Sequence, residues 1–311
     1  MEEEIHNLLT INQIEFEKIF QLSIFNTYYL PKHKLHLHLI TIQKFQESIL
    51  PKDYFQKLSD TINAQGERII HLGEDVWLNQ KDLVQSRILA MIGKFKRLNA
   101  RHCIIERIDK KISDKFLKIN HLQGSVNAKF KYGLFLKPQY IQRFGLVVCE
   151  DTDNGTENEH LGLVVCEDTG NGTENEHPTQ QFYNSTNQSL MIAVATFSGG
   201  RLMKYGERMG ERSYELIRFA SLRGYSVMGG MDKLLKAFEL EHNPDDIMSY
   251  ADRDWSDGRS YEILGFERIE NIEPQTFLLD NQIFKRHSVK ENVENCIEIF
   301  NAGSIKFIRR K

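Results

Sequence analysis

Hydrophobic and polar residues alternate over several short stretches after residue 100, and this period of two predicts β-strands. Such alternation predicts strands at residues 103–108 and 129–136. A strongly apolar run predicts a third strand at 190–197, and further strands are predicted at 213–220, 246–251, 266–269 and 275–279. We expect 129–136 and 190–197 to pair as a hairpin with a long connection. Two apolar runs between residues 296 and 308, joined by Asn301-Ala302-Gly303, predict a closing hairpin.

Other stretches place their apolar residues on one face of a helix. Residues 116–119 belong to one predicted helix, for which Ser113 is the expected N-cap. Residues 231–240 form a second, and residues 259–264 form a short third helix that ends at Gly265 as C-cap. The alternation of strands and helices predicts an α/β (α+β) fold, with a mixed, mostly antiparallel sheet flanked by helices.

The first hundred residues show their own alternation of strand and helix patterns. The predicted elements are a strand at 36–42, a helix at 52–62, a strand at 68–72 and a helix at 82–95. Because a new run of strands begins after the last of these helices, we expect a domain boundary near residue 98. The sequence thus predicts a small α/β domain over 1–98 and a larger domain over 99–311.

Composition narrows the possible classes of protein. The 311 residues carry a net charge of −3, so no global basic field indicates nucleic-acid binding. The sequence has no apolar run long enough for a membrane span and no signal-peptide pattern after Met1, which predicts a cytoplasmic protein without a membrane partner. The four cysteines form no Cys-x-x-Cys pair, which disfavours a zinc ribbon, and no metal site is predicted.

A tandem repeat interrupts the predicted hairpin. Residues 145–160 and 162–177 differ only at Asp153 and Gly170. The repeat is too short for a solenoid unit. Its polar, acidic and turn-prone half is typical of an exposed loop. We interpret 145–177 as an acidic insertion in a surface loop that tolerates changes of length.

A glycine-rich loop lies between the predicted strand 213–220 and the predicted helix 231–240. It reads Arg223-Gly224-Tyr225-Ser226-Val227-Met228-Gly229-Gly230. Unpaired N–H groups and the dipole at a helix start favour phosphate, and glycines let an anion approach the backbone. The alternative is that the glycines only allow a sharp strand–helix turn.

From about Arg101 to Gln282 the order of elements resembles the GNAT superfamily of acyltransferases. The segment 261–266, Tyr-Glu-Ile-Leu-Gly-Phe, resembles the closing signature of that family. The resemblance implies an acyl-coenzyme A, such as acetyl-coenzyme A, bound by Arg223, Gly224, Gly229 and Gly230. The glycine loop departs from the usual family spacing, because four residues separate its two glycine positions.

The same resemblance assigns two catalytic roles. Tyr261 is the expected general acid for the leaving thiolate, and Glu215 is the expected base that deprotonates the amine. Tyr261 could instead pack its ring under the short helix. Glu215 could instead pair with Arg218 or Arg212.

A second polar group lies in residues 249–258, after a predicted strand. It includes Asp252, Asp254 and Trp255. Open α/β sheets bind ligands at the carboxyl ends of their strands, and a tryptophan there could stack on a base. The alternative is an Asp-rich turn in which Asp257 or Ser256 caps the next helix.

Four segments resemble GNAT-like domains of phage-type proteins, and more distantly the phage adenine-modification protein Mom. They are residues 120–124, 214–219, 229–234 and 249–253. This resemblance implies action on or near DNA, with His121, Arg218 and Asp252 as site residues. His121 is otherwise a structural histidine.

Residues 68–77 resemble the end of PD-(D/E)xK-type nucleases, with Gly73 where that pattern has an aromatic residue. Such a nuclease needs carboxylates for a divalent metal. The strand 36–42 contains no acid, which predicts a degenerate, inactive nuclease-like domain. His33, His36 and His38 could form a metal cluster, and His36 and His38 share one strand face. No fourth ligand is evident, which favours a solvated strand face.

Two hypotheses follow from the sequence. The first is a GNAT-like acyltransferase that uses an acyl-coenzyme A to modify an amine, such as a nucleic-acid base. The second is a DNA-binding or endonuclease-associated protein of mobile-element origin, in which the GNAT-like fold is not catalytic. The basic residues available to contact DNA are Lys94, Lys96, Arg97, Arg101 and Arg107. The oligomeric state is not predicted.

Overall fold

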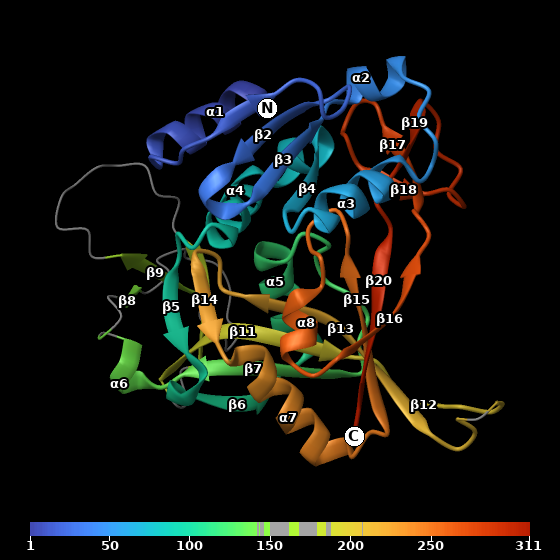
Figure 1. The fold of residues 1–311 in the computed structure, drawn as a ribbon. Helices are drawn as coiled ribbons and strands as arrows, with labels where there is room; N and C mark the ends of the chain where they lie inside the picture. The colour runs from blue at the N-terminus through green and yellow to red at the C-terminus, as the bar shows by residue number, and fades with distance from the viewer. Residues whose placement is uncertain (142, 144–145, 150–161, 168–178, 185–187, 207) are drawn as a thin grey trace. The chain divides into compact units, whose positions relative to one another are not determined.

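The computed structural model describes residues 1–311 except 142, 144–145, 150–161, 168–178, 185–187 and 207 (Figure 1). The chain forms two compact units. The first combines Met1–Gln85 with Met248–Arg310, and the second comprises Ser86–Ile247 together with Lys311. These units differ from the predicted division near residue 98, because the segment after Met248 packs with the N-terminal region.

The N-terminal part of the first unit is a four-stranded sheet with helices. Its strands are β1 (Glu17–Ile19), β2 (Asn26–Leu30), β3 (Leu35–Ile40) and β4 (Arg68–Gly73), in that order across the sheet. Its helices are α1 (Glu2–Ile11), α2 (Ile42–Glu47), α3 (Tyr54–Ala64) and the first part of α4 (Glu74–Met91). β3 and β4 run parallel and are almost wholly buried, as expected for parallel strands.

The C-terminal part of the first unit adds two further groups of strands. β20 (Ser304–Arg310) lies between β15 (Asp246–Asp252) and β16 (Glu267–Ile272), and the short helix α8 (Arg259–Ile263) precedes β16. β17 (Thr276–Asp280) pairs with both β18 (Arg286–Ser288) and β19 (Cys296–Phe300). The predicted closing hairpin is therefore wrong. Its two apolar runs form β19 and β20, which pair with different strands.

Aromatic side chains join the two ends of the chain within the first unit. Phe25 and Phe55 form a buried cluster with Ala302. Phe300 packs against the same cluster, with its ring centroid 5.3 Å from that of Phe55. The N-terminal residues thus share a hydrophobic core with residues near the C-terminus.

The second unit is built on an antiparallel sheet. β6 (Cys103–Arg107), β7 (Phe130–Leu136), β11 (Ser189–Phe197) and β13 (Arg212–Ser221) are neighbours in that order. α5 (Lys110–Asn120) and α7 (Gly230–His242) lie on opposite faces of this sheet (Figure 1). Every residue of β11 is buried, which places the core along this central strand. A separate parallel pair consists of β5 (Lys96–Asn99) and β14 (Tyr225–Met228).

One helix of the second unit owes its position to aromatic packing. Phe238 of α7 stacks on Phe197 of β11, with ring centroids 3.9 Å apart. Tyr132 and Tyr214 meet the Phe238 ring edge-on from the neighbouring strands β7 and β13. Such pairs add to the free energy of area burial. The apolar face predicted for 231–240 is therefore the face that packs on the sheet.

The structure confirms the mixed α/β fold class with mostly antiparallel sheets. β7 and β11 pair as predicted. Their connection contains the short helix α6 (Pro138–Ile141) and the strands β8 (Leu146–Cys149), β9 (Gly162–Glu167) and β10 (Thr179–Asn184). The first residues of both repeat copies thus form the antiparallel pair β8 and β9. The acidic half of each copy lies outside the described residues.

The start of α5 corrects one prediction. Asp109 is the N-cap, and its carboxylate accepts a hydrogen bond from the Ile112 N–H at 2.8 Å. Ser113, the expected N-cap, is buried inside the helix. None of the described helices is both long enough and apolar enough to span a membrane.

Candidate functional site

The glycine loop begins just after β13 and is tied to the rest of the second unit. The Arg223 N–H donates to Asn120 Oδ1 at 2.8 Å. The Gly224 N–H donates to Ser86 Oγ at 3.0 Å. The two amides that were predicted to meet the cofactor diphosphate at this end of the loop are therefore used within the protein.

The middle of the loop forms a strand. The Tyr225 N–H donates to the Leu222 carbonyl at 3.0 Å, and Tyr225–Met228 then pairs in parallel with Lys96–Asn99. The sequence offered no signal for this strand, because its partner lies more than 120 residues away. The prediction of an open loop over 223–230 is wrong for its first six residues.

The end of the loop keeps the properties of a helix start. Gly229 is the N-cap of α7 with φ +72°, a conformation that glycine adopts at low cost. Lys233 makes the first bond of the helix, from its N–H to the Gly229 carbonyl. The amides of residues 230–232 precede that bond, so they have no partner inside the helix. Gly229 and Gly230 thus lie where a helix can receive an anion.

Three predicted site residues come together in the second unit. Burial raises the pKa of Glu215, and the nearby Arg218 guanidinium acts in the opposite direction. Burial lowers the pKa of His121 to about 3, and the guanidiniums of Arg218 and Arg87 act in the same direction. The effect of Arg218 on this pKa agrees with the alternative in which Glu215 pairs with that arginine.

His121 is an uncharged imidazole in this cluster. Its Nδ1 accepts a hydrogen bond from the Gln123 N–H at 3.1 Å. This bond leaves the single proton of the neutral ring on Nε2. Arg218, which acts on His121, also acts on Glu215, a half-buried carboxylate that binds a proton more readily than an exposed one because its pKa is raised. The cluster can therefore accept protons at Glu215, and His121 can donate a hydrogen bond without carrying charge.

Tyr261, the predicted general acid, lies in α8 of the first unit. Its ring stacks on Phe307 at 5.2 Å and meets Phe266 edge-on at 5.3 Å. Ser249 Oγ donates to the Tyr261 hydroxyl at 3.0 Å. The packing role considered for Tyr261 is present, and its hydroxyl belongs to a polar contact.

The Asp-rich segment after β15 is a folded turn in the first unit. The Asp252 carboxylate accepts the Asp254 N–H at 3.0 Å, and the Asp252 carbonyl accepts the Trp255 N–H at 3.1 Å. Trp255 is only 7% exposed, so its ring is not available to stack on a base in this conformation. The helix that follows has Gly258 as its N-cap instead of Asp257 or Ser256.

The surroundings of Asp254 include residues that the sequence analysis missed. Arg286 donates from Nε and Nη2 to the two oxygens of Asp75, at 2.5 and 3.1 Å. Burial raises the pKa of Asp254; the neighbouring Asp252 charge acts in the same direction, whereas Arg286 opposes it. No local signal could have found this group, because Asp75 and Arg286 are 211 positions apart.

A small cavity of about 20 Å³ adjoins these side chains. Its polar lining comprises His71, Asp75, Asp254 and Arg286, and its apolar lining includes Ile40, Phe45 and Phe300. That volume holds about one water molecule. Gly73 keeps the space open, since a Cβ at this position would lie 2.4 Å from Asp75 Oδ1. In this conformation the cavity has no room for a substrate.

The histidines of β3 and β4 form hydrogen bonds to other side chains. His38 Nδ1 and His71 Nδ1 are 2.9 Å apart, and the far nitrogens of the two rings contact Ser23 and Ser59. His36 pairs with Glu67 at 2.6 Å. Within the described residues, no group of three or more His, Cys, Asp or Glu side chains could hold a metal ion.

No family model matches the sequence, and no curated protein matches it. Several solved structures show remote similarity to this chain, among them the following two. One is the NatC complex bound to Gag peptide and CoA, at 10% identity and a TM-score of 0.30, covering 68% of this chain and 99% of that one. The other is PH1933 from Pyrococcus horikoshii OT3, at 12% identity and a TM-score of 0.23, covering 39% of this chain and 59% of that one. Neither likeness is close enough to assign a fold or an activity.

Proposed function

We propose that the chain transfers an acyl group from a coenzyme A thioester to an amine, with Glu215 as the general base. The observation that carries this proposal is the half-buried Glu215 carboxylate, whose pKa is raised by burial. The structure also contains, in sequence order, the elements on which the GNAT resemblance depends: β6, α5, β7 with β11, β13, α7, β15 and α8.

The chemistry requires two proton movements. The amine nitrogen loses a proton as it bonds to the acyl carbon, and the thiolate gains one as the carbon–sulfur bond breaks. A base works best when its pKa lies close to the working pH, and an ordinary glutamate is too acidic. Burial of Glu215 shifts its pKa in the useful direction.

The helix start at Gly229 and Gly230 suits the cofactor diphosphate better than the first half of the loop. The amides of residues 230–232 and the positive end of the α7 dipole attract an anion. Arg223 and Gly224 do not fit the role assigned to their amides, because Asn120 and Ser86 already accept those hydrogen bonds. Bound coenzyme A thioester would supply the activated acyl group.

We assign the proton for the leaving thiolate to Tyr261, as the resemblance implies. Its hydroxyl already takes part in a hydrogen bond with Ser249. The proposed acceptor is a primary amine, including the exocyclic amine of a nucleic-acid base.

The first experiment measures cofactor binding to the full chain by calorimetry with acetyl-coenzyme A. Met228 is 50% exposed and directly precedes Gly229, so Met228→Glu adds a negative charge beside the α7 start. We expect Met228→Glu to weaken binding several-fold, because like charges repel. Met228→Gln, the uncharged control of equal size, should bind like the wild type. An absence of binding at millimolar acetyl-coenzyme A would falsify the cofactor assignment.

The second experiment follows thiol release with a panel of amines. Glu215→Gln should lower kcat by about 10²- to 10⁴-fold while acetyl-coenzyme A binding stays unchanged. Tyr261→Phe keeps the ring packing and should lower kcat with little effect on folding. Equal rates for Glu215→Gln and the wild type would remove Glu215 from the mechanism.

A further inference from the structure

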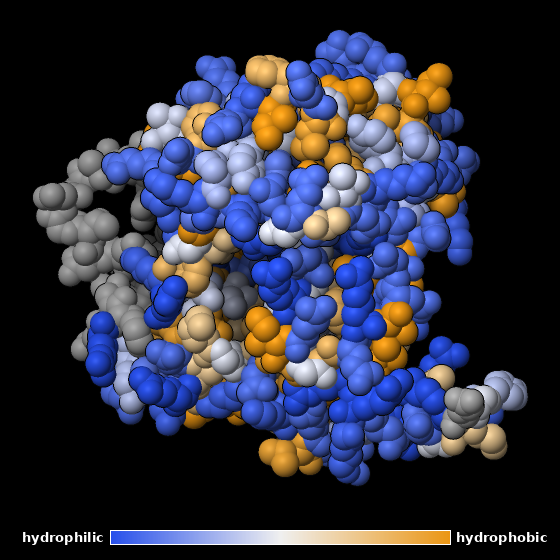
Figure 2. All heavy atoms as spheres, viewed as in Figure 1, coloured by the Kyte–Doolittle hydropathy of each residue, from blue (hydrophilic) through white to orange (hydrophobic). Residues whose placement is uncertain are grey.

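The second unit carries a projecting β-ribbon that the proposed acyl transfer does not use. β12 (Arg201–Leu202) pairs antiparallel with the start of β13, with Leu202 opposite Arg212. Two more hydrogen bonds extend the ribbon, from the Met203 N–H to the Glu211 carbonyl and from the Gly210 N–H to the Met203 carbonyl. We call residues 201–212 the arm; it projects from the second unit in Figures 1 and 2.

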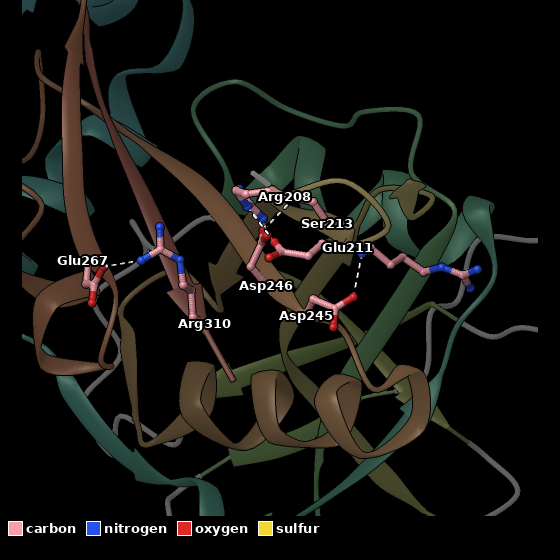
Figure 3. Close-up of polar contacts among 8 residues, drawn as sticks. Arg208, Glu211, Ser213, Asp245, Asp246, Glu267 and Arg310 are labelled. Atoms are coloured by element: carbon pink, nitrogen blue, oxygen red, sulfur yellow. Dashed lines mark hydrogen bonds and ion pairs between the residues drawn. The ribbon is translucent and has the colours of Figure 1, made fainter. Parts of the chain in front are cut away.

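Buried polar contacts hold the base of the arm in place (Figure 3). Asp246 is 1% exposed, pairs with Arg208 and accepts a hydrogen bond from Ser213 Oγ at 2.6 Å. Arg208 also donates from Nε to Glu211 at 2.6 Å. A buried ion pair with additional hydrogen bonds fixes geometry. The arm is therefore an anchored structure.

The backbone of the arm is fastened at a second place. Asp245 Oδ2 accepts the Arg212 N–H at 2.6 Å (Figure 3). The Asp245 N–H donates to the Arg212 carbonyl at 3.1 Å. These bonds fix the strand from which the Arg212 side chain extends. An ordered backbone lowers the entropy lost when exposed side chains bind a partner.

Among the described residues of the arm, the exposed side chains are apolar or positively charged. Three apolar side chains are strongly exposed: Leu202 at 51%, Tyr205 at 85% and Met209 at 74%. The exposed charged side chains among the described residues of the arm are Arg201, Lys204 and Arg212. The acid Glu211 is paired with Arg208. The described surface of the arm therefore combines positive charge with apolar groups near its tip.

The pleat of the ribbon places these residues for a partner. Leu202 and Arg212 are directly opposite, so they share one face, and Lys204 follows two residues after Leu202. Tyr205 comes next, at the turn that includes Gly206 with φ +80°. Arg212 thus lies beside Leu202 on one face of the ribbon, and Lys204 and the Tyr205 ring follow towards its tip.

From these observations we propose that the arm binds double-stranded nucleic acid. A two-stranded ribbon fits the major groove, and apolar side chains of ribbons and arms wedge between base steps in the minor groove. Lys204, Arg212 and Arg201 contact phosphates, and the Tyr205 ring packs against a base or sugar. This inference goes beyond the acyl-transfer proposal, and its test does not require catalysis.

The test is fluorescence anisotropy of a labelled DNA duplex with the full chain, over a series of salt concentrations. We expect Lys204→Ala and Arg212→Ala each to reduce the slope of log affinity against log salt by about 1. Tyr205→Ala should weaken binding about tenfold with an unchanged slope, because it removes no charge. Lys115→Ala removes an exposed charge from α5 and serves as the matched control.

Three results would overturn the proposal. The first is that anisotropy does not change at micromolar protein in low salt. The second is that the arm variants bind DNA as tightly as the wild type and the Lys115→Ala control. The third is that polyglutamate competes with the labelled duplex as well as unlabelled DNA does at the same charge concentration. The last result would mean that the arm recognises any acidic polymer, including an acidic protein. Thermal unfolding of each variant confirms that the fold is retained.

Discussion

At the scale of single residues, burial decides the charge of several histidines. Burial lowers the pKa of His71 to about 3 and that of His38 well below 6.5, so both rings are neutral at physiological pH. The sequence could place His36 and His38 on one strand, but it could not show that His38 meets His71. That contact depends on the parallel pairing of β3 and β4.

The lowered pKa of His71 makes the free energy of unfolding depend on pH. The pKa of His71 is depressed in the folded state, so below about pH 6.5 the unfolded chain binds a proton that the folded chain does not. We expect His71 to contribute a loss of about 1.4 kcal/mol per pH unit as pH falls from 6.5 towards 4.5. Urea unfolding of the wild type and of His71→Gln at pH 7, 6 and 5 measures this loss of stability. The free energies of the two proteins should differ less at pH 5 than at pH 7, and a constant difference would contradict the shift.

Glu215 leads to a prediction about the rate of acyl transfer. Because burial raises its pKa, the carboxylate takes up a proton at a higher pH than an exposed glutamate. We expect kcat/KM to fall with decreasing pH along a single-proton curve whose midpoint lies above the usual glutamate value of about 4.3. Glu215→Asp should retain a pH-dependent rate at lower kcat, and Glu215→Gln should lose this limb of the profile.

At the scale of elements, periodicity predicted most strands and helices but not what the loops do. The apolar positions of β7 and β13, the continuous apolar run of β11 and the helical face of α7 all reflect burial on one sheet, so the sequence carries them. β14 was missed because its pairing with β5 joins residues that are distant in sequence. The acceptors of the Arg223 and Gly224 amides, Asn120 and Ser86, are also distant in sequence. The sequence therefore could not show that these amides are already hydrogen-bonded.

The cap of α5 offers a direct test at this scale. Asp109→Ala removes the carboxylate that accepts the Ile112 N–H, so we expect a loss of about 1 kcal/mol in the free energy of unfolding. Asp109→Asn keeps an accepting oxygen and should cost only a few tenths of that. Chemical denaturation of both variants provides the comparison. Equal losses would show that the side chain does not cap the helix.

The start of α7 provides another test. Gly229 has φ +72°, and a Cβ added there would meet nothing nearer than Ala100 Cβ at 3.9 Å. The cost of Gly229→Ala should therefore come from backbone strain alone, roughly 1–2 kcal/mol. Gly229→Asn should be milder, because asparagine tolerates the left-handed region. Chemical denaturation should give a lower unfolding midpoint for Gly229→Ala than for Gly229→Asn. Equal midpoints for the two variants would argue against backbone strain at position 229.

At the scale of the whole molecule, the sequence did not predict which segments pack together. A boundary near residue 98 followed from the change of local pattern, whereas the first compact unit combines Met1–Gln85 with Met248–Arg310. Long-range contacts such as Arg286 with Asp75, and Phe300 with Phe55, leave no trace in local periodicity. The sequence predicted Asp252 and Asp254 as a polar group but missed Asp75 and Arg286, because these two residues are distant from Asp254 in sequence.

This organisation predicts that residues 1–98 do not fold alone. Their core includes Ala302 and Phe300, and the His71 N–H bonds to the Asp254 carbonyl. A fragment 1–98 should therefore show poor amide dispersion by NMR. Co-expression with residues 248–311 should restore protection from proteolysis, and a well-dispersed spectrum for the fragment alone would refute the expectation.

The joining of both chain ends in one unit has a consequence during synthesis. About 160 residues separate Gln85 from Met248. At a translation rate of ~5–20 residues per second, the N-terminal sheet waits roughly 8–30 s for the strands that complete its core. The intervening segment is continuous and can collapse first. Until then the apolar residues of the N-terminal sheet and its helices remain exposed to chaperones and proteases, and a ribosome that stalls before residue 248 leaves the core of the first unit unfinished.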